Sequence, residues 1–339
     1  MSWKILIPDR VKDAQSYETE VFGSEHEIFT PCASEASEIP DDLWATADAI
    51  LLWHDIHLDE SAIFKLNSCK VIVRVGVGYD NVDLIAARKK GIHVCNIPDY
   101  GTNDVADHAL AMTTSLFRGL YDYTERLRES PLDWTWSSEF PRKRIQGSRL
   151  GIVGLGRIGT ATALRAKAFG FEVDFHDPYK PDGYDKALGL NRFDELEEMI
   201  AVADCVSFHV PLTDETTGMA GEEFFEKLKT GCFIVNTARG GIVETSFLHK
   251  ALKSGKVAGA ALDVIEEEPL NPESPLFRSW INREEWIANR LILSPHCAFY
   301  CLESYREMRI KAAIEAKGVL EGNLPRNCVN PKSIIDGAS

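Results

Sequence analysis

The sequence lacks the features of several protein classes. No apolar run reaches the roughly 20 residues that span a membrane, and the first residues do not resemble a secretory signal. Lys and Arg number only 37 against 52 Asp and Glu, which gives a net charge of −15. Nucleic acids and anionic membranes attract basic surfaces. We therefore expect no nucleic-acid or membrane partner, and a cytoplasmic location.

Cysteine patterns are also missing. The eight cysteines include no Cys-x-x-Cys pair, and most lie in apolar stretches, as Cys95 and Cys232 do. Such residues are typical of buried free thiols in a reducing compartment. Cys297 and Cys301 are spaced to share a helix face, but no further ligand residues cluster near them. We expect neither a disulfide framework nor a metal site.

The chain is rich in alternating β-like runs and helical patterns, which are typical of parallel sheets covered by helices. Its 339 residues are enough for about two domains. A helical run from Val105 to about Glu129 should join two open α/β sheets, and it either faces a partner subunit or is an ordinary core helix. A last helix, about 302–321, should return the chain to the first domain. The strands are expected at residues 4–8, 49–53, 71–75, 92–97, 149–154, 171–176, 205–210, 232–237, 257–264 and 291–294.

A glycine-rich turn gives the strongest local signal. The strand at 149–154 runs into Gly154-Leu155-Gly156-Arg157-Ile158-Gly159, and a helical pattern follows directly. The glycines Gly154, Gly156 and Gly159 allow a tight turn, close approach of a pyrophosphate, and close packing of helix on strand. The next strand ends at Asp177, which can accept hydrogen bonds from a ribose. This pattern predicts an NAD site in a cofactor domain that is inserted into a substrate domain.

Three kinds of polar side chain follow later strands, where open α/β folds place their sites. Arg239 can grip a carboxylate with two hydrogen bonds, although a surface arginine in a glycine-rich turn is equally consistent. His296 follows an apolar strand and is suited to acid–base work near neutral pH. One glutamate of the run 266–268 could orient His296 and favour its charged form, and side-chain chemistry does not choose among the three.

Six motifs together resemble the D-isomer-specific 2-hydroxyacid dehydrogenases over nearly the whole chain. They are VRVGVGYDNVD (73–83), GIVGLGRIG (151–159), HVPLTDETTG (209–218), VNTARGG (235–241), AALDVIEEEP (260–269) and SPH (294–296). Within the family, the chain most closely resembles the branch that includes the C-terminal-binding proteins, through RAKAFGFEVDFHDPY, ALGL and the final NCVN.

The resemblance implies that Arg239, Glu268 and His296 form the catalytic set, and it thereby selects one glutamate of the three. It implies NAD as cofactor, a small 2-oxo or 2-hydroxy acid as substrate, and a homodimer formed through the cofactor domain. The implied nucleotide contacts are Arg157, Ile158, Asp177, Val210, Pro211, Thr216, Thr237, Ala238 and Asp263. The implied substrate contacts are Arg74, Val77, Gly78 and Phe299.

The implied fold is an α/β protein of two domains. A Rossmann-type NAD-binding domain, 103–297, is inserted into a flavodoxin-like substrate domain, 1–102 with 298–339. A nucleotide-sensing scaffold like the C-terminal-binding proteins is the alternative, and the intact catalytic set argues against it. Phe299 stands where those proteins carry tryptophan, which leaves the identity of the substrate open. A formate dehydrogenase of the same fold is disfavoured by Glu268, because formate oxidation needs no Glu–His acid–base pair.

Asp177 leads to a testable expectation about the cofactor. Its carboxylate should repel the 2′-phosphate of NADPH, at a cost of roughly 1–3 kcal/mol, or about one to two decades in affinity. We expect kcat/KM to be higher with NADH than with NADPH by a factor of that order. Steady-state kinetics with both cofactors measures it, and equal values would contradict the role given to Asp177.

Overall fold

The structure, a computed structural model, describes residues 2–11, 15–136 and 142–331. The chain divides into two compact units. The first unit comprises Met1–Gly101 and Tyr300–Ser339, and the second comprises Thr102–Phe299. The second unit is therefore an insertion in the sequence of the first. None of the described helices has the length and apolar character that crossing a membrane requires.

The first unit is built on a five-stranded parallel sheet with the order β2-β1-β3-β4-β5. This is the flavodoxin-like strand order. Strands β3 and β4 are buried along their whole length, as expected for parallel strands covered on both faces. The elements are β1 (Lys4–Leu6), α1 (Ser16–Phe22), β2 (Glu27–Phe29), α2 (Asp41–Thr46), β3 (Ala49–Leu52), α3 (Glu60–Phe64), β4 (Val71–Arg74), α4 (Leu84–Lys89), β5 (His93–Asn96) and α13 (Leu302–Leu320).

The second unit is built on a seven-stranded parallel sheet with the order β12-β11-β10-β9-β6-β7-β8. Counted from β6, this is the Rossmann order 3-2-1-4-5-6 with one further strand. Its strands are β6 (Arg149–Val153), β7 (Glu172–His176), β8 (Asn191–Arg192), β9 (Cys205–Phe208), β10 (Cys232–Asn236), β11 (Val257–Leu262) and β12 (Leu291–Leu293). Together with the sheet of the first unit, it confirms the predicted α/β fold class.

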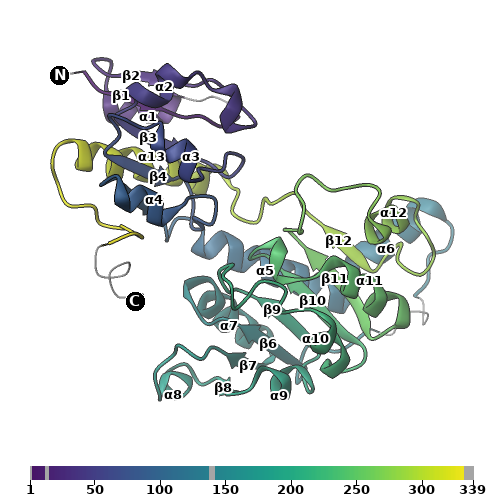
Figure 1. The fold of residues 1–339 in the computed structure, drawn as a ribbon. Helices are drawn as coiled ribbons and strands as arrows, with labels where there is room; N and C mark the ends of the chain where they lie inside the picture. Colours follow the sequence, from purple (N-terminus) through teal and green to yellow (C-terminus); the bar gives the residue numbers. More distant parts are fainter. Residues whose placement is uncertain (1, 12–14, 137–141, 332–339) are drawn as a thin grey trace. The chain divides into compact units, whose positions relative to one another are not determined.

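Helices cover both faces of the seven-stranded sheet (Figure 1). On one face, α5 (Thr102–Arg118) and α7 (Arg157–Phe169) contribute to a core that includes Phe117 and Phe175. On the other face, α9 (Leu196–Ile200), α10 (Glu222–Lys227), α11 (Thr245–Ser254) and α12 (Pro275–Ile281) enclose a second core. The remaining α-helices that the structure describes in this unit are α6 (Leu120–Glu129) and α8 (Tyr184–Leu188).

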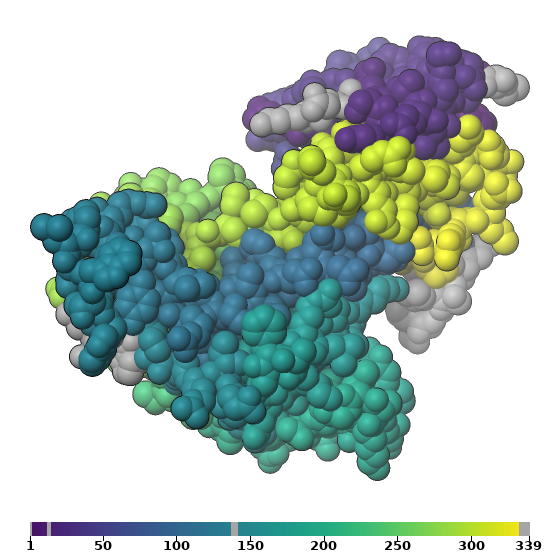
Figure 2. Space-filling view, turned by 180° about the vertical axis from the view of Figure 1, so that it is seen from behind, coloured from purple at the N-terminus to yellow at the C-terminus, as the bar shows by residue number. Residues whose placement is uncertain are grey.

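Helix α13 returns the chain to the first unit, where it packs on α1, β3 and β4 (Figure 1). Figure 2 shows this C-terminal part lying against the N-terminal part of the chain. Arg309 of α13 is fully buried and donates two hydrogen bonds to the Glu18 carboxylate of α1, at 2.8 and 2.6 Å. This two-pronged ion pair joins the two chain segments from which the first unit is made.

Two details differ from the sequence prediction. The predicted helical run from Val105 to about Glu129 is two helices, because Gly119 adopts a left-handed φ of +64° and ends α5 there. The short strands β2 and β8 were not predicted. Both strands are the last in their sheets and are partly exposed. Their sequences therefore lack the apolar run by which the buried strands were predicted.

Candidate active site

The glycine-rich turn connects β6 to α7, and each predicted glycine meets a different demand. Gly154 has a φ of +90°, and a Cβ atom there would lie 2.6 Å from Val210 Cγ1. A Cβ atom on Gly159 would lie 2.0 Å from the Gly154 carbonyl oxygen, so strand and helix pack too closely for any side chain. Gly156 instead faces open space at the N-terminus of α7. A phosphate can approach the free N–H groups of this helix end.

Asp177 lies just beyond β7 and is tied to the same turn. Its carboxylate accepts hydrogen bonds from the Leu155 N–H at 2.8 Å and the Tyr179 N–H at 3.0 Å. These bonds fix the carboxylate beside the glycine-rich turn. Arg157 and Ile158 form the first turn of α7, with Arg157 exposed to solvent.

The loops after β9 and β10 carry the next group of predicted nucleotide contacts. Thr216 holds one loop closed, because its hydroxyl donates to the Pro211 carbonyl at 2.6 Å and accepts from the Thr213 N–H at 2.9 Å. Val210 packs against the core of the second unit, and Ala238 donates its N–H to the side chain of Asn236 at 3.0 Å.

Two shielded polar atoms at these strand ends have no hydrogen-bond partner among the described residues. They are Thr237 Oγ1 and His209 Nδ1. Burial lowers the pKa of His209 to about 4, so its ring is neutral at pH 7 and can donate or accept. Buried polar atoms are normally paired. The open space at Gly156 and these two atoms therefore fit a polar ligand such as NAD.

Asp263 lies directly after β11 and holds the segment that follows β12. Its carboxylate accepts hydrogen bonds from the Ser294 hydroxyl and from the N–H groups of Cys297 and Ala298, the latter two at 2.9 Å. Its carbonyl accepts the His296 N–H at 2.8 Å. His296 has a φ of +49°, which non-glycine residues rarely adopt. The backbone of this residue is thus set by the buried Asp263.

The structure sorts the three glutamates that follow β11. Glu266 accepts the Thr245 N–H in the first turn of α11 at 2.6 Å, and Glu267 accepts the Asn271 amide at 3.2 Å. Glu268 Oε2 lies 2.8 Å from His296 Nδ1, and its other oxygen accepts the Ile265 N–H at 3.1 Å. The glutamate nearest the proline is therefore the one that contacts the histidine.

Arg239 follows β10 in a turn that presses against the Glu268 loop. A Cβ atom on Gly240 would lie 1.8 Å from the Ile265 carbonyl oxygen, so only glycine permits this approach. Asn236 secures the turn, because its amide donates to the Arg239 carbonyl at 2.8 Å. The guanidinium of Arg239 donates to the Ala238 carbonyl at 2.7 Å. Strands β10, β11 and β12 are parallel neighbours, so Arg239 and the Glu268–His296 pair follow adjacent carboxyl ends of the same sheet.

The remaining predicted residues are divided between the units. Arg74, Val77 and Gly78 belong to the first unit, and Phe299 ends the second. Arg74 is 7% exposed, and its guanidinium donates to the Val75 carbonyl. The Val77 carbonyl accepts the Asn96 amide at 2.6 Å. Both contacts shape the loop after β4.

His108 was missed by sequence reasoning. It lies in α5, and its Nε2 is 3.1 Å from the Ser294 hydroxyl and 3.9 Å from Asp263 Oδ1. It forms a group with Asp263 and Cys297 whose ligand atoms lie within 4.8 Å of one another. Asp263 already accepts three hydrogen bonds from the 294–298 segment. The expectation of no metal ion stays a prediction.

Comparisons with known proteins identify the family of the chain. The model of the D-isomer specific 2-hydroxyacid dehydrogenase NAD binding domain matches residues 110–298. The chain is 36% identical to C-terminal-binding protein 1 of Caenorhabditis elegans over 312 residues, 89% of this chain but 42% of that protein. It is 36% identical to a glyoxylate reductase of Korarchaeum cryptofilum over 266 residues, 78% of this chain and 77% of that protein.

A solved structure resembles the whole chain. The crystal structure of D-lactate dehydrogenase from Aquifex aeolicus, complexed with NAD and lactic acid, superposes with a TM-score of 0.85 at 28% identity, covering 97% of this chain and 100% of that one. The predicted family and the predicted cofactor NAD are confirmed. The chain belongs to the D-isomer-specific 2-hydroxyacid dehydrogenases, a family of NAD-dependent oxidoreductases that act on the CH–OH group of their donors.

Proposed function

We propose that this protein interconverts a small 2-oxo acid and its D-2-hydroxy acid with NADH and NAD. The main support for this proposal is the 2.8 Å contact between Glu268 and His296, at the carboxyl ends of the strands that Arg239 also follows. A cation, a proton donor and a carboxylate that orients the donor are what reduction of a 2-oxo acid requires. The cytoplasmic location stays a prediction.

In this mechanism each side chain has a distinct role. The Arg239 guanidinium binds the substrate carboxylate and polarises the carbonyl. His296 holds Glu268 through Nδ1, which leaves Nε2 to give a proton to the carbonyl oxygen during reduction and to take it back during oxidation. The glycine-rich turn and the residues after β9 and β10 would hold NAD, whose nicotinamide would supply the hydride for reduction or accept it in oxidation.

The substrate class follows from the site and from the relatives together. The glyoxylate reductase and the D-lactate dehydrogenase both act on small 2-oxo or 2-hydroxy acids by their names. The scaffold alternative draws on the likeness to C-terminal-binding protein 1, of which the chain spans less than half. The Glu268–His296 pair favours turnover, because a purely scaffolding protein has no need of an oriented proton donor.

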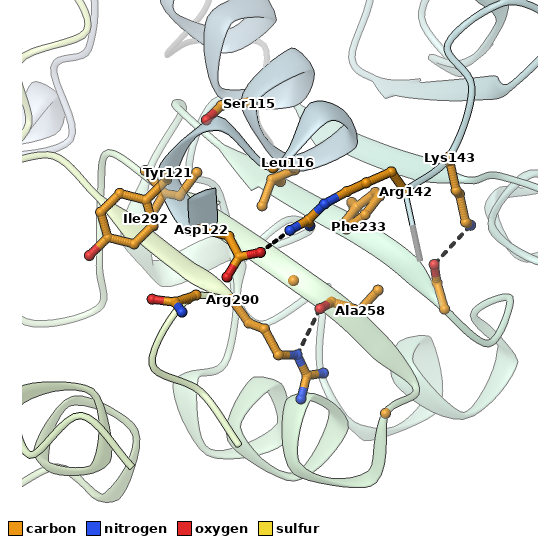
Figure 3. Close-up of a pocket in the computed structure, with 15 residues that line it drawn as sticks. Ser115, Leu116, Tyr121, Asp122, Arg142, Lys143, Phe233, Ala258, Arg290 and Ile292 are labelled. Atoms are coloured by element: carbon orange, nitrogen blue, oxygen red, sulfur yellow. Dashed lines mark hydrogen bonds and ion pairs between the residues drawn. The ribbon is translucent and has the colours of Figure 1, made fainter. Parts of the chain in front are cut away.

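The second unit also carries a feature that supports a homodimer, which we propose forms through this unit. Leu132, Trp134 and Trp136 are 99%, 83% and 77% exposed. Large apolar side chains gathered on a surface mark an interaction site. The same unit has a pocket of about 340 Å³ between α5, α6 and the starts of β11 and β12 (Figure 3). There Arg142 pairs with Asp122, so the pocket has a polar wall beside its apolar floor.

Arg239→Lys tests the carboxylate clamp. Lysine keeps the charge but cannot form the two-pronged contact. The loss of transition-state stabilisation should be about 2.7–4 kcal/mol, which lowers kcat/KM roughly 100- to 1000-fold. NADH oxidation should be followed with glyoxylate, hydroxypyruvate, pyruvate and larger 2-oxo acids. The control is Arg10→Lys at an exposed arginine of the first unit. No turnover of any acid by the wild-type protein would refute the proposed function, and near-normal kcat/KM in Arg239→Lys would refute the clamp.

A pH profile tests the Glu268–His296 pair. Reduction starts from protonated His296, so kcat/KM for reduction should fall at high pH, where the proton donor is lost. Glu268→Gln keeps the shape but removes the charge that favours imidazolium, so the falling limb for reduction should move to lower pH. The rising limb for oxidation, which needs neutral His296, should move the same way. His296→Ala should cost about two to four decades of rate.

The matched control for this profile is Glu267→Gln, because Glu267 contacts Asn271 and not His296. Its limbs should stay in place. Deuterated NADH checks that hydride transfer limits the rate in each variant. If chemistry is limiting and the limb of Glu268→Gln does not move, Glu268 does not stabilise protonated His296.

The dimer is tested by sedimentation velocity. The double variant Trp134→Lys, Trp136→Lys places two charges on the proposed interface and should sediment as a monomer where the wild type is a dimer. Phe169→Lys, at another aromatic residue of the second unit that is 56% exposed, should leave the dimer intact. A wild type that is monomeric at micromolar concentration would overturn the proposal.

A further inference from the structure

In the first unit, the segment after α13 covers the free edge of the sheet. Strand β5 is the last in the sheet order, and its Cys95 forms an antiparallel bridge with Cys328. The Asn96 N–H donates to the Asn327 carbonyl at 3.3 Å, and the Val329 N–H donates to the Val94 carbonyl at 2.8 Å. These two bonds flank the cysteines, which makes Cys95 and Cys328 a non-hydrogen-bonded pair.

This register places the two thiols where a covalent bond can join them. In a non-hydrogen-bonded antiparallel pair the Cα atoms lie about 4.5 Å apart and the side chains share one face. Disulfides join cysteines whose Cα atoms are about 4.4–6.8 Å apart. Both thiols are free, with Cys95 fully buried and Cys328 partly exposed. The sulfur of Cys328 is therefore the one that solvent reaches.

Two side chains hold the register. Asn330 is fully buried, accepts the Val94 N–H at 2.8 Å and donates to the Ile92 carbonyl at 2.9 Å. The Glu315 carboxylate of α13 accepts the N–H groups of Arg326 and Asn327, at 2.7 and 3.2 Å. A slip of one residue would break all four bonds. The cysteine pairing is thus a fixed feature of the fold and not a chance contact.

We propose that Cys95 and Cys328 are a site of reversible oxidative modification, at which a low-molecular-weight disulfide of the glutathione type converts the two thiols to an intramolecular disulfide.

The order of events follows from the environment of each thiol. Burial and the Glu315 carboxylate raise the pKa of the Cys95 thiol well above its usual value, so Cys95 is a poor first nucleophile. Cys328 Sγ lies 3.9 Å from His93 Nδ1, which can accept its proton. The Cys328 thiolate attacks the small disulfide and releases one thiol. Cys95 then attacks the Cys328 sulfur and releases the second, so the protein loses two electrons and two protons and the small disulfide gains them.

The crosslink would close the first unit covalently. Cys95 precedes the inserted second unit and Cys328 follows it, so the disulfide joins the two chain segments of the first unit. Closing so long a loop restricts the unfolded chain strongly, and a rise in Tm on the order of 5 °C is expected. In a reducing compartment the bond would be transient, as redox-sensing disulfides are.

The test is a redox titration of the full-length protein with mixtures of reduced and oxidised glutathione. Free thiols are then blocked with N-ethylmaleimide under denaturing conditions, and unreduced digests are mapped by mass spectrometry. We expect two fewer blockable thiols, a peptide pair linked through Cys95 and Cys328, and a higher Tm that reverts on reduction. Absence of the linked pair at every ratio, or linkage of other cysteines instead, would overturn the proposal.

Variants separate the two steps. Cys95→Ala should stop at a glutathione adduct on Cys328, while Cys328→Ala should leave Cys95 unmodified. Cys32→Ala removes an exposed cysteine elsewhere in the first unit and should still form the crosslink. If Cys95 were modified as readily in Cys328→Ala as in the wild type, the assigned order of attack would be wrong. None of these readouts depends on turnover, so they stand apart from the proposed activity.

Discussion

One buried carboxylate sets the geometry on which the candidate active site depends. Asp263 receives the Ser294 hydroxyl and two N–H groups beyond it, and its carbonyl receives the N–H of His296. Together these bonds hold His296 in a left-handed backbone conformation that it would not adopt alone. The direction of the imidazole, and hence its contact with Glu268, follows from that conformation. The proposed proton donor is thus placed by a residue that need not touch the substrate.

Parallel strands supply the second constraint. All strands of this sheet are parallel, so their carboxyl ends lie on the same side of it. This brings Arg239, Asp263 and His296 together from distant parts of the sequence. Neighbouring strands alone do not bring these side chains together, because the loops that follow the strands must also pack closely against one another. A side chain at position 240 would clash with the Ile265 carbonyl. A side chain at position 159 would clash with the Gly154 carbonyl, where α7 packs against β6. Glycine is required at these positions because it permits the close approach of two backbone segments, not because it makes the chain flexible.

The sequence predicts the fold well where long apolar runs and glycine turns coincide, as at β6, β10 and β11. It fails where no local signal exists. The two strands β2 and β8 are short and partly exposed, and Gly119 reads as an ordinary helix residue until its φ is known. Side-chain chemistry could not separate Glu266, Glu267 and Glu268, because their difference lies in what each one reaches across space. His108 was missed for the same reason, since its neighbours come from β11 and β12.

The Arg309–Glu18 pair has a consequence for how the protein is made. On the ribosome, residues of α1 emerge early, and α13 emerges only after the whole second unit has been synthesised. Until then the nascent first unit lacks the helix that covers β3 and β4, and Glu18 has no buried cation to face. The second unit, whose chain is continuous, can fold in the meantime. The first unit therefore closes only after the whole second unit has been synthesised, and β3 and β4 stay without the cover of α13 until then.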